Sequence, residues 1–304
     1  MATYLITQAT GQQAQWTIRH LLAAGAKVHA IVRDPSKIPE VLKSPGVTIF
    51  KGESANFDDV FQAAQGCKAV YLNTFPIPGL ELQQAQTITS AARKAGLESV
   101  VACTTMCTGY RDMWDDAATE ACHLLGYYRS KAGVEDAVRG AGFAAWTILR
   151  PAFIHVDYML PNAHGNFPRL PTHGVLDHCF DAGARMVQTD GSDIGRYAAA
   201  ALQDPAKFAG HEIELGSENL TIEEIRDVLV RVSGRDVGIR RLTPEDGTPA
   251  PGQLFHLWAN AKDFGPVVAA AREAQAKFGI PFTSLEEALQ RDKSGLLECL
   301  PVKA

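Results

Sequence analysis

Apolar and polar positions in the first 150 residues follow two alternating periods. Short apolar, β-branched runs predict strands covered on both faces, at Thr3–Thr7, Lys27–Val32, Val47–Phe50, Ala69–Asn73, Ser99–Cys103 and Ala145–Leu149. Segments with helical spacing separate them, at Gln13–Ala24, Phe57–Gln65, Leu82–Ala95 and Tyr127–Gly140. Glycines follow these helices, where a positive φ ends a helix at little cost, at Gly25, Gly66, Gly96 and Gly142. The alternation predicts an α/β fold, a doubly wound parallel Rossmann sheet with right-handed crossovers.

The pattern changes after Arg150-Pro151. Residues 151–187 are rich in Pro, Gly, His and aromatic residues and have no long period, which is typical of a binding loop or lid. Order returns with a helix near Ile194–Leu202 and a strand near Glu212–Leu215. Thr221 and Glu224 form the capping box of a further helix over Ile222–Ser233.

The rest of the chain alternates less regularly. We expect a strand near Val237–Leu242 and helices near residues 254–278 and 284–292. Residues 1–150, rejoined by about 188–216, are therefore predicted to form the Rossmann domain. The remainder, residues 151–187 and 217–304, is predicted to form a smaller, mostly C-terminal α+β domain that binds substrate.

Charge and cysteine usage narrow the class of protein. The 304 residues carry a net charge of −5, which argues against nucleic acid or an anionic membrane as partner. No apolar run reaches the about 18–20 residues that span a bilayer. The six cysteines include no Cys-x-x-Cys pair, so we expect free thiols in a reducing compartment and therefore a cytoplasmic location. The partner that we expect is a small-molecule substrate.

The first predicted strand runs into a glycine-containing turn and then directly into a helix. A dinucleotide site needs such a turn, because the helix N-terminus offers free N–H groups to a pyrophosphate. Of the spacing Gly-x-x-Gly-x-x-Gly only Gly11 is present, with Gln8 and Ala14 at the flanking positions. Ala14 is a mild change, whereas Gln8 either narrows the turn or offers its amide to the phosphates. The βαβ context indicates a nucleotide cofactor.

The end of the second strand discriminates between cofactors. Arg33 lies 22 residues after Gly11, close to the position that reads the adenosine ribose. Arg33 and Lys37 offer cationic groups to a 2′-phosphate, which favours NADP(H). Two alternatives stay open: Asp34 turns inward and favours NAD, or Arg33 and Asp34 form a solvated pair that opens a turn before Pro35.

Several segments together resemble the NmrA-like family of atypical short-chain dehydrogenase/reductases. They are Ala9-Thr10-Gly11-Gln12-Gln13, Val32-Arg33-Asp34, Ser130-Lys131-Ala132-Gly133-Val134-Glu135, Thr147-Ile148-Leu149-Arg150-Pro151-Ala152-Phe153 and Asp193-Ile194-Gly195-Arg196. The resemblance covers residue 3 to about 242 and implies an NADP(H)-binding Rossmann domain with a smaller substrate domain. The family contains both reductases and nucleotide-sensing regulators without turnover.

The same resemblance implies which residues contact the cofactor. By position, the pyrophosphate lies at Gly11, Gln12 and Gln13, with Thr10 also in contact with the cofactor, and the 2′-phosphate lies at Arg33 and Lys37. Thr74 and Phe75 lie along the cofactor after the fourth strand, and Pro151 and Phe153 lie near the nicotinamide.

A Tyr-x-x-x-Lys pattern lies on the predicted helix over Tyr127–Gly140. Tyr127 and Lys131 are four residues apart and share one helix face, so the ammonium can stabilise a Tyr127 phenolate and reach the nicotinamide ribose. Thr104 and Thr105 follow the fifth strand, and by analogy with extended short-chain dehydrogenases we favour Thr105 as the hydroxyl that holds the substrate oxygen. A plain packing pair is the alternative interpretation of Tyr127 and Lys131.

The irregular segment concentrates histidines and aromatic residues. His155, His164, His173 and His178 are spaced by 9, 9 and 5 residues, which matches no metal-ligand pattern, so no metal site is expected. We predict that His155, Tyr158 and Phe167 contact substrate, with His155 as a candidate acid or base and an aromatic lining that suits a planar carbonyl compound. Ordinary packing of the small domain is an equal alternative.

Three functions from different classes remain. The leading hypothesis is an NADPH-dependent reductase of a carbonyl or activated double bond in a small, largely apolar molecule of specialised metabolism. The alternatives are a non-catalytic NADP(H)-sensing regulator and a redox-neutral isomerase or dehydratase on the same scaffold. Nucleophile-elbow, Walker and His-Glu-x-x-His motifs are absent from the sequence, so hydrolase and kinase activities lack support.

Overall fold

The computed structural model describes residues 1–77, 79–216 and 218–302, and the chain divides into two compact units. Unit 1 comprises Met1–Gly109, Gly126–Pro151 and Gly191–Ile213. Unit 2 comprises Tyr110–Leu125, Ala152–Asp190 and Glu214–Ala304. The division after Pro151 lies one residue from the predicted boundary. Residues 110–125, which the sequence interpretation assigns to the first domain, belong to unit 2. The sequence pattern missed this departure from the sheet because no apolar period marks it.

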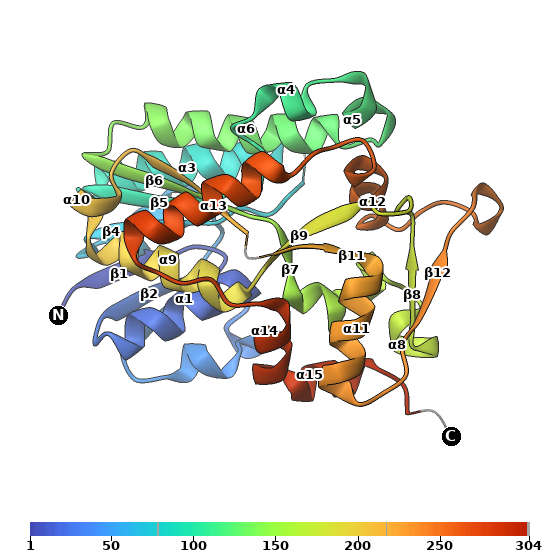
Figure 1. The fold of residues 1–304 in the computed structure, drawn as a ribbon. Coiled ribbons are helices and arrows are strands. Elements are labelled where there is room, and N and C mark those ends of the chain that lie inside the picture. Colours follow the sequence, from blue (N-terminus) through green and yellow to red (C-terminus); the bar gives the residue numbers. More distant parts are fainter. Residues whose placement is uncertain (78, 217, 303–304) are drawn as a thin grey trace. The chain divides into compact units, whose positions relative to one another are not determined.

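Unit 1 is built on a seven-stranded parallel sheet, as the sequence predicts (Figure 1). In spatial order the strands are β10 (His211–Leu215), β6 (Ala145–Pro151), β5 (Ser99–Cys103), β4 (Ala69–Leu72), β1 (Thr3–Ile6), β2 (Lys27–Val32) and β3 (Val47–Lys51). The chain crosses over between β3 and β4, so the carboxyl ends of β1 and β4 form a topological switch point. Ligands of open α/β sheets bind at such a point.

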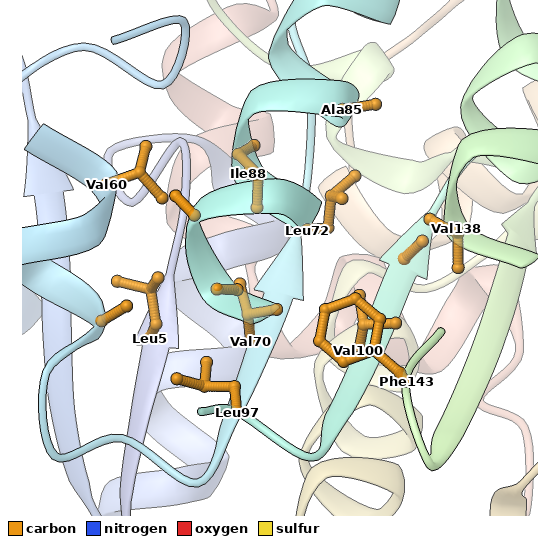
Figure 2. Packing of buried hydrophobic residues seen from close by; sticks show 14 of the residues in the cluster. Leu5, Val60, Val70, Leu72, Ala85, Ile88, Leu97, Val100, Val138 and Phe143 are labelled. Carbon is orange, nitrogen blue, oxygen red and sulfur yellow. The ribbon is translucent and has the colours of Figure 1, made fainter. Parts of the chain in front are cut away.

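Helices cover both faces of this sheet. They are α1 (Gln12–Ala23), α2 (Phe57–Ala64), α3 (Leu80–Lys94), α6 (Leu125–Gly140), α9 (Gly191–Gln203) and α10 (Pro205–Phe208), with the 3₁₀ turns η1 (Pro35–Lys37) and η2 (Glu40–Lys43). Figure 2 shows one core, in which Val60 of α2, Ile88 of α3 and Val138 of α6 meet the strand side chains Leu5, Val70, Leu72 and Val100. All of these side chains are buried, which is why the strands read as continuous apolar runs.

The other face is closed by α1 and α9, which pack at very short range. A Cβ built at Gly195 of α9 would lie 2.5 Å from the carbonyl carbon of Trp16 and 2.7 Å from the nitrogen of Thr17, both in α1. Because the obstructing atoms are backbone, only glycine allows this approach. The packing holds α1, and with it the turn that precedes it, against the sheet.

Unit 2 is built from shorter elements. Its strands are β7 (Phe153–Ile154), β8 (Val175–His178), β9 (Arg185–Thr189), β11 (Glu218–Thr221) and β12 (Gly238–Arg241). Its helices are α4 (Arg111–Trp114), α5 (Ala117–Ala121), η3 (His155–Tyr158), α7 (Ala163–Asn166), α8 (Leu170–His173), α11 (Ile222–Ser233), η4 (Pro244–Asp246), α12 (Gln253–Ala259), α13 (Gly265–Phe278), α14 (Leu285–Arg291) and α15 (Lys293–Cys299). The strands form two small sheets, β11-β9-β7 and β12-β8.

Most predicted elements are confirmed, and two expectations are wrong. The capping box of Thr221 and Glu224 begins α11, and all four predicted glycines have positive φ. The segment 151–187 is not structureless, because it contains several strands and helices too short to show a period. The single helix expected over 254–278 is two helices, since Pro266 in the first turn of α13 lacks the N–H that a continuous helix needs there.

Two further features of the described residues concern the thiols and the apolar character of the helices. All six cysteines are free thiols, five of them buried. In the described ranges, no helix combines the length and the apolar character needed to cross a membrane.

Gly195→Ala tests the contact between α1 and α9. The added methyl forces the two helices apart, and we expect a loss of about 1–3 kcal/mol in the free energy of unfolding, measured by chemical denaturation. Gly140→Ala, at the end of α6 where a Cβ meets no atom within 4 Å, is the matched control and should be neutral or stabilising. Equal stability of the two variants would contradict the close approach.

Candidate functional site

The turn between β1 and α1 has the geometry of an anion cradle. The Thr7 hydroxyl donates to the carbonyl oxygens of Tyr71 and Asn73, both at 3.0 Å, which fixes the end of β1 against β4. Gln8 adopts a φ of +50°, and the Gly11 N–H donates to its carbonyl oxygen at 2.9 Å. The left-handed residue of the turn is thus a glutamine, at a position where the dinucleotide pattern has glycine. Gly11 closes the turn with its N–H and adds no side chain to it.

Gly11 is also the N-cap of α1. It makes no side-chain cap, and a Cβ there would lie 3.2 Å from the Gln8 carbonyl oxygen. The first N–H groups of a helix have no acceptor within the helix, so those of Gln12 and Gln13 are available to a phosphate. This cradle fits the pyrophosphate of a dinucleotide.

A cavity of unit 1 lies between this turn and the ends of β2 and β3. Gln8, Thr10, Arg33, Ser54 and Phe75 are among its lining residues. The guanidinium of Arg33 is exposed, and within the described ranges no acidic side chain is paired with it. Arg33 thus presents an exposed cation on a cavity that begins at the phosphate turn.

Asp34, the alternative reader of the ribose, is already engaged. Its carboxylate accepts from the Ser36 N–H at 3.0 Å and from the Ser36 hydroxyl at 2.6 Å, so it caps the turn η1. Lys37 lies 3.8 Å from Asp34, with 83% of its side chain exposed, and is not part of the cavity lining. Of the two predicted cations, Arg33 lines the cavity and Lys37 does not.

The residues after β4 connect the cradle to α3. The Asn73 amide donates to Gln13 at 3.3 Å, and the Thr74 hydroxyl donates to Glu81 at 2.8 Å. Phe75 lines the cavity with 48% of its surface exposed and gives it an apolar side. The Thr74 side chain therefore serves the protein interior in this structure.

The predicted catalytic pair lies on one face of α6. The Lys131 ammonium is 5.4 Å from the centroid of the Tyr127 ring, and its closest partner is the Glu81 carboxylate of α3, at 2.6 Å. Burial alone would lower the pKa of Lys131, but Tyr127 and Glu81 outweigh it and raise the pKa. Lys131 is thus a buried ammonium ion beside a half-buried tyrosine.

Glu81 is the residue that sequence reasoning missed. It stands in the first turn of a helix, where acidic residues are normally solvated and interact with the helix dipole. Here it is 1% exposed. The signal that could have found it is the uncompensated cation at Lys131, which requires a carboxylate somewhere in the fold.

The two threonines after β5 have different surroundings. The Thr104 hydroxyl donates to Glu135 at 2.9 Å, and Glu135 receives two hydrogen bonds from the Arg150 guanidinium, at 2.9 and 2.7 Å. Gly109 passes directly over this guanidinium, because a Cβ there would be 2.3 Å from it. Thr104 thus belongs to a buried structural network, which leaves Thr105 as the candidate hydroxyl.

His155 lies in a buried ionic network of unit 2. Its Nδ1 is 3.2 Å from Asp190 and its Nε2 is 2.8 Å from Asp292, and the side chain is 1% exposed. Arg291 joins the same group, with 2.6 and 2.8 Å contacts to Asp190. The predicted acid or base therefore has carboxylates at both ring nitrogens, and it ties η3 to the ends of β9 and α14.

The predicted aromatic contacts form a cluster of rings inside unit 2. The rings of Phe153 and Tyr158 are 5.3 Å apart, those of Tyr158 and Phe167 are 5.5 Å apart, and His256 lies 5.1 Å from Phe167. The Tyr158 hydroxyl donates to Gln188 at 3.0 Å. Tyr158 and Phe167 are each 1% exposed, so in this structure they pack the interior, and only Phe153 is partly accessible.

Comparison with known proteins agrees with the motifs. The sequence profile of the NmrA-like family matches residues 2–251. The agroclavine dehydrogenase of Claviceps fusiformis is 29% identical over 131 residues, which are 40% of this chain and 43% of that enzyme. The chain likewise spans less than half the length of two further curated relatives that it matches.

Two solved structures share the fold. The quinone oxidoreductase QOR2 of Escherichia coli, described as NADPH-dependent, has a TM-score of 0.70 at 22% identity and covers 95% of this chain and 99% of its own. The negative transcriptional regulator NmrA in complex with NADP has a TM-score of 0.73 at 20% identity and covers 95% of this chain and 94% of its own. An oxidoreductase and a transcriptional regulator therefore share this architecture.

Asp157, two residues after His155, offers a test of the interior of unit 2. Burial raises the pKa of Asp157 to about 6, although hydrogen bonds from Asn162 and Ile154 oppose the rise. Between the unfolded value of about 3.9 and that pKa, the folded state holds more protons, so the free energy of unfolding falls as pH rises through this window.

Asp157→Asn should remove this pH dependence. Thermal unfolding of both proteins from pH 4 to pH 7 is the measurement, and the stability of the variant relative to the wild type should increase with pH. Parallel curves would show that Asp157 ionises as readily in the folded chain as in the unfolded one.

Proposed function

The chain belongs to the NmrA-like family, and we propose that it is an NADPH-dependent reductase of a carbonyl or activated double bond in a small, largely apolar molecule. The observation that carries this proposal is the buried Lys131 ammonium, 5.4 Å from the centroid of the Tyr127 ring. A phenol beside a permanent cation is equipped to exchange a proton with a substrate oxygen.

The cofactor preference rests on the cavity of unit 1. The N-terminus of α1 accommodates the pyrophosphate, and Arg33 offers its guanidinium to a 2′-phosphate while Asp34 is held by Ser36. This arrangement supports NADP(H) over NAD(H). The Asp34 carboxylate, which would repel the 2′-phosphate, is instead hydrogen-bonded to Ser36 at the start of η1.

The roles of the chain's residues follow from their chemistry. When bound, the nicotinamide supplies a hydride to the substrate. Tyr127 donates its phenolic proton to the substrate oxygen, and Lys131 stabilises the phenolate that remains. The Thr105 hydroxyl holds the same substrate oxygen, since the Thr104 hydroxyl is bound to Glu135. The names of the related agroclavine dehydrogenase and quinone oxidoreductase support a substrate of apolar, ring-containing character.

A nucleotide-sensing regulator is the second candidate. The observation that favours it is Gln8, which takes the left-handed position of the phosphate turn in place of a glycine. The fold shared with NmrA accommodates this departure from the dinucleotide pattern. Such a protein would bind NADP(H) selectively without oxidising it. Turnover decides between the two functions.

Arg33→Ser tests the cofactor preference. We expect NADPH to bind about 10- to 100-fold more weakly, because a charge-assisted contact to the 2′-phosphate is lost, while NADH affinity stays unchanged. Isothermal titration with both nucleotides measures this. Lys37→Ala, which removes a cation outside the cavity lining, should have a smaller effect. An unchanged ratio of the two affinities in Arg33→Ser would refute the assignment.

Tyr127→Phe tests catalysis. NADPH oxidation is followed by absorbance with a panel of quinones, ketones and enones, and kcat should fall about 10²- to 10⁴-fold in the variant with little change in NADPH affinity. Tyr128→Phe is the control, since the neighbouring ring is fully buried. Undiminished turnover of Tyr127→Phe removes Tyr127 from the mechanism, and selective NADPH binding with no turnover by the wild type favours the regulator.

A further inference from the structure

The Glu81 carboxylate receives three hydrogen bonds inside unit 1. Lys131 donates to Oε1 at 2.6 Å, the Thr74 hydroxyl donates to Oε1 at 2.8 Å, and the Ser130 hydroxyl donates to Oε2 at 2.6 Å. Glu81 is 1% exposed and the Lys131 side chain is 7% exposed. A carboxylate so deeply buried needs all of these donors, because each oxygen has lost its water.

The groups that face the Lys131 ammonium come from several elements. Glu81 approaches from α3, Tyr127 from α6 and the Cys103 thiol from β5, and Tyr71 of β4 lies behind Cys103. Burial raises the pKa of Cys103 to about 12 and holds that of Tyr71 well above its usual range, so both stay neutral. Among these groups Glu81 is the carboxylate, and it is the one that accepts a hydrogen bond from the ammonium.

The ion pair with Glu81 fixes the position of the Lys131 ammonium. Lysine has three N–H donors, and one of them is directed to Glu81. Thr74, which is bound to the same carboxylate oxygen, lies two residues after the end of β4, at the switch point of the sheet. Glu81 therefore links the cofactor side of the sheet to the residue that faces Tyr127.

We propose that Glu81 is a positioning residue of the reductase site, whose buried carboxylate holds the Lys131 side chain as an ammonium ion beside Tyr127. The inference rests on the proposed function of Lys131 and adds to it a third member on α3. Glu81 itself touches neither substrate nor the reacting atoms.

Glu81→Gln separates this role from simple packing. The variant keeps the shape of the side chain and one acceptor oxygen but removes its charge, which leaves the buried Lys131 ammonium without its carboxylate partner. Burial disfavours the charged amine, so the pKa of Lys131 should drop below its unfolded value of about 10.4 by one unit or more.

The first measurement needs no cofactor and no substrate. In Glu81→Gln the unfolded chain binds more protons than the folded one at pH values between the two pKa values of Lys131, so stability should rise with pH. Between pH 7 and pH 9.5 the Tm of the variant should therefore increase relative to that of the wild type. In the double variant Glu81→Gln/Lys131→Met the increase should disappear, because the titrating amine is gone.

The second measurement uses the proposed reaction. The alkaline limb of the pH profile of kcat/KM should move to lower pH in Glu81→Gln by one unit or more, and NADPH affinity should show a matching loss at alkaline pH. Ser130→Ala, which removes a neutral hydrogen bond from the same carboxylate, should keep the wild-type profile. Glu81→Asp, which retains the charge, should restore the wild-type limb at least in part.

Failure of the inference and failure of the proposed function are distinguishable. An active wild type whose Glu81→Gln variant keeps both the pH profile and the pH dependence of Tm overturns the positioning role alone. A wild type that oxidises no NADPH overturns the reductase, while the unfolding series still decides whether Glu81 maintains the charge of Lys131. Absence of the Tm increase in the unfolding series overturns the inference in either case.

Discussion

The burial of two opposite charges on α6 is the constraint on which this structure depends. Lys131 and Glu135 stand one helical turn apart on the face that meets the sheet, and both are buried. Each is compensated from another element, Lys131 by Glu81 of α3 and Glu135 by Arg150 of β6. A buried ion whose partner is removed costs several kcal/mol, so these pairs fix the position of α6 relative to its neighbours in unit 1.

The same constraint explains the arrangement of the residues that surround the two ion pairs in unit 1. Thr104, Gly109 and Thr74 all lie where the two ion pairs require them, the first two beside Arg150 and Glu135, the third at Glu81. These residues serve the interior, whereas Tyr127, Thr105 and Arg33, which are also predicted site residues, contribute no side chain to either ion pair in the described part of the chain. Thr104 and Thr105 therefore differ in their surroundings because Thr104 donates to the Glu135 carboxylate of one of these ion pairs.

The phosphate turn illustrates how a motif tolerates substitution. Gln8 takes the left-handed conformation that glycine adopts more readily, with a cost that the surrounding contacts must offset. Those contacts are visible, since Thr7 is anchored to β4 and Gly11 to Gln8 itself. Close packing of Gly195 on α1 adds to the same rigidity. The motif that matters physically is the geometry of the turn, which one glycine of the pattern is sufficient to form here.

The sequence by itself determined the elements of unit 1 and the likeness to a family, because burial on both faces and helical spacing are local properties. It also predicted that Arg33 follows the end of a strand and that Tyr127 and Lys131 share one face of a helix, because both relations depend on local spacing. Tertiary structure alone decided that Glu81 is buried against Lys131, that Asp34 serves η1, and that His155 is held by Asp190 and Asp292. Such pairings join residues far apart in the chain, and the partner of a charge is chosen by folding, which no periodicity records.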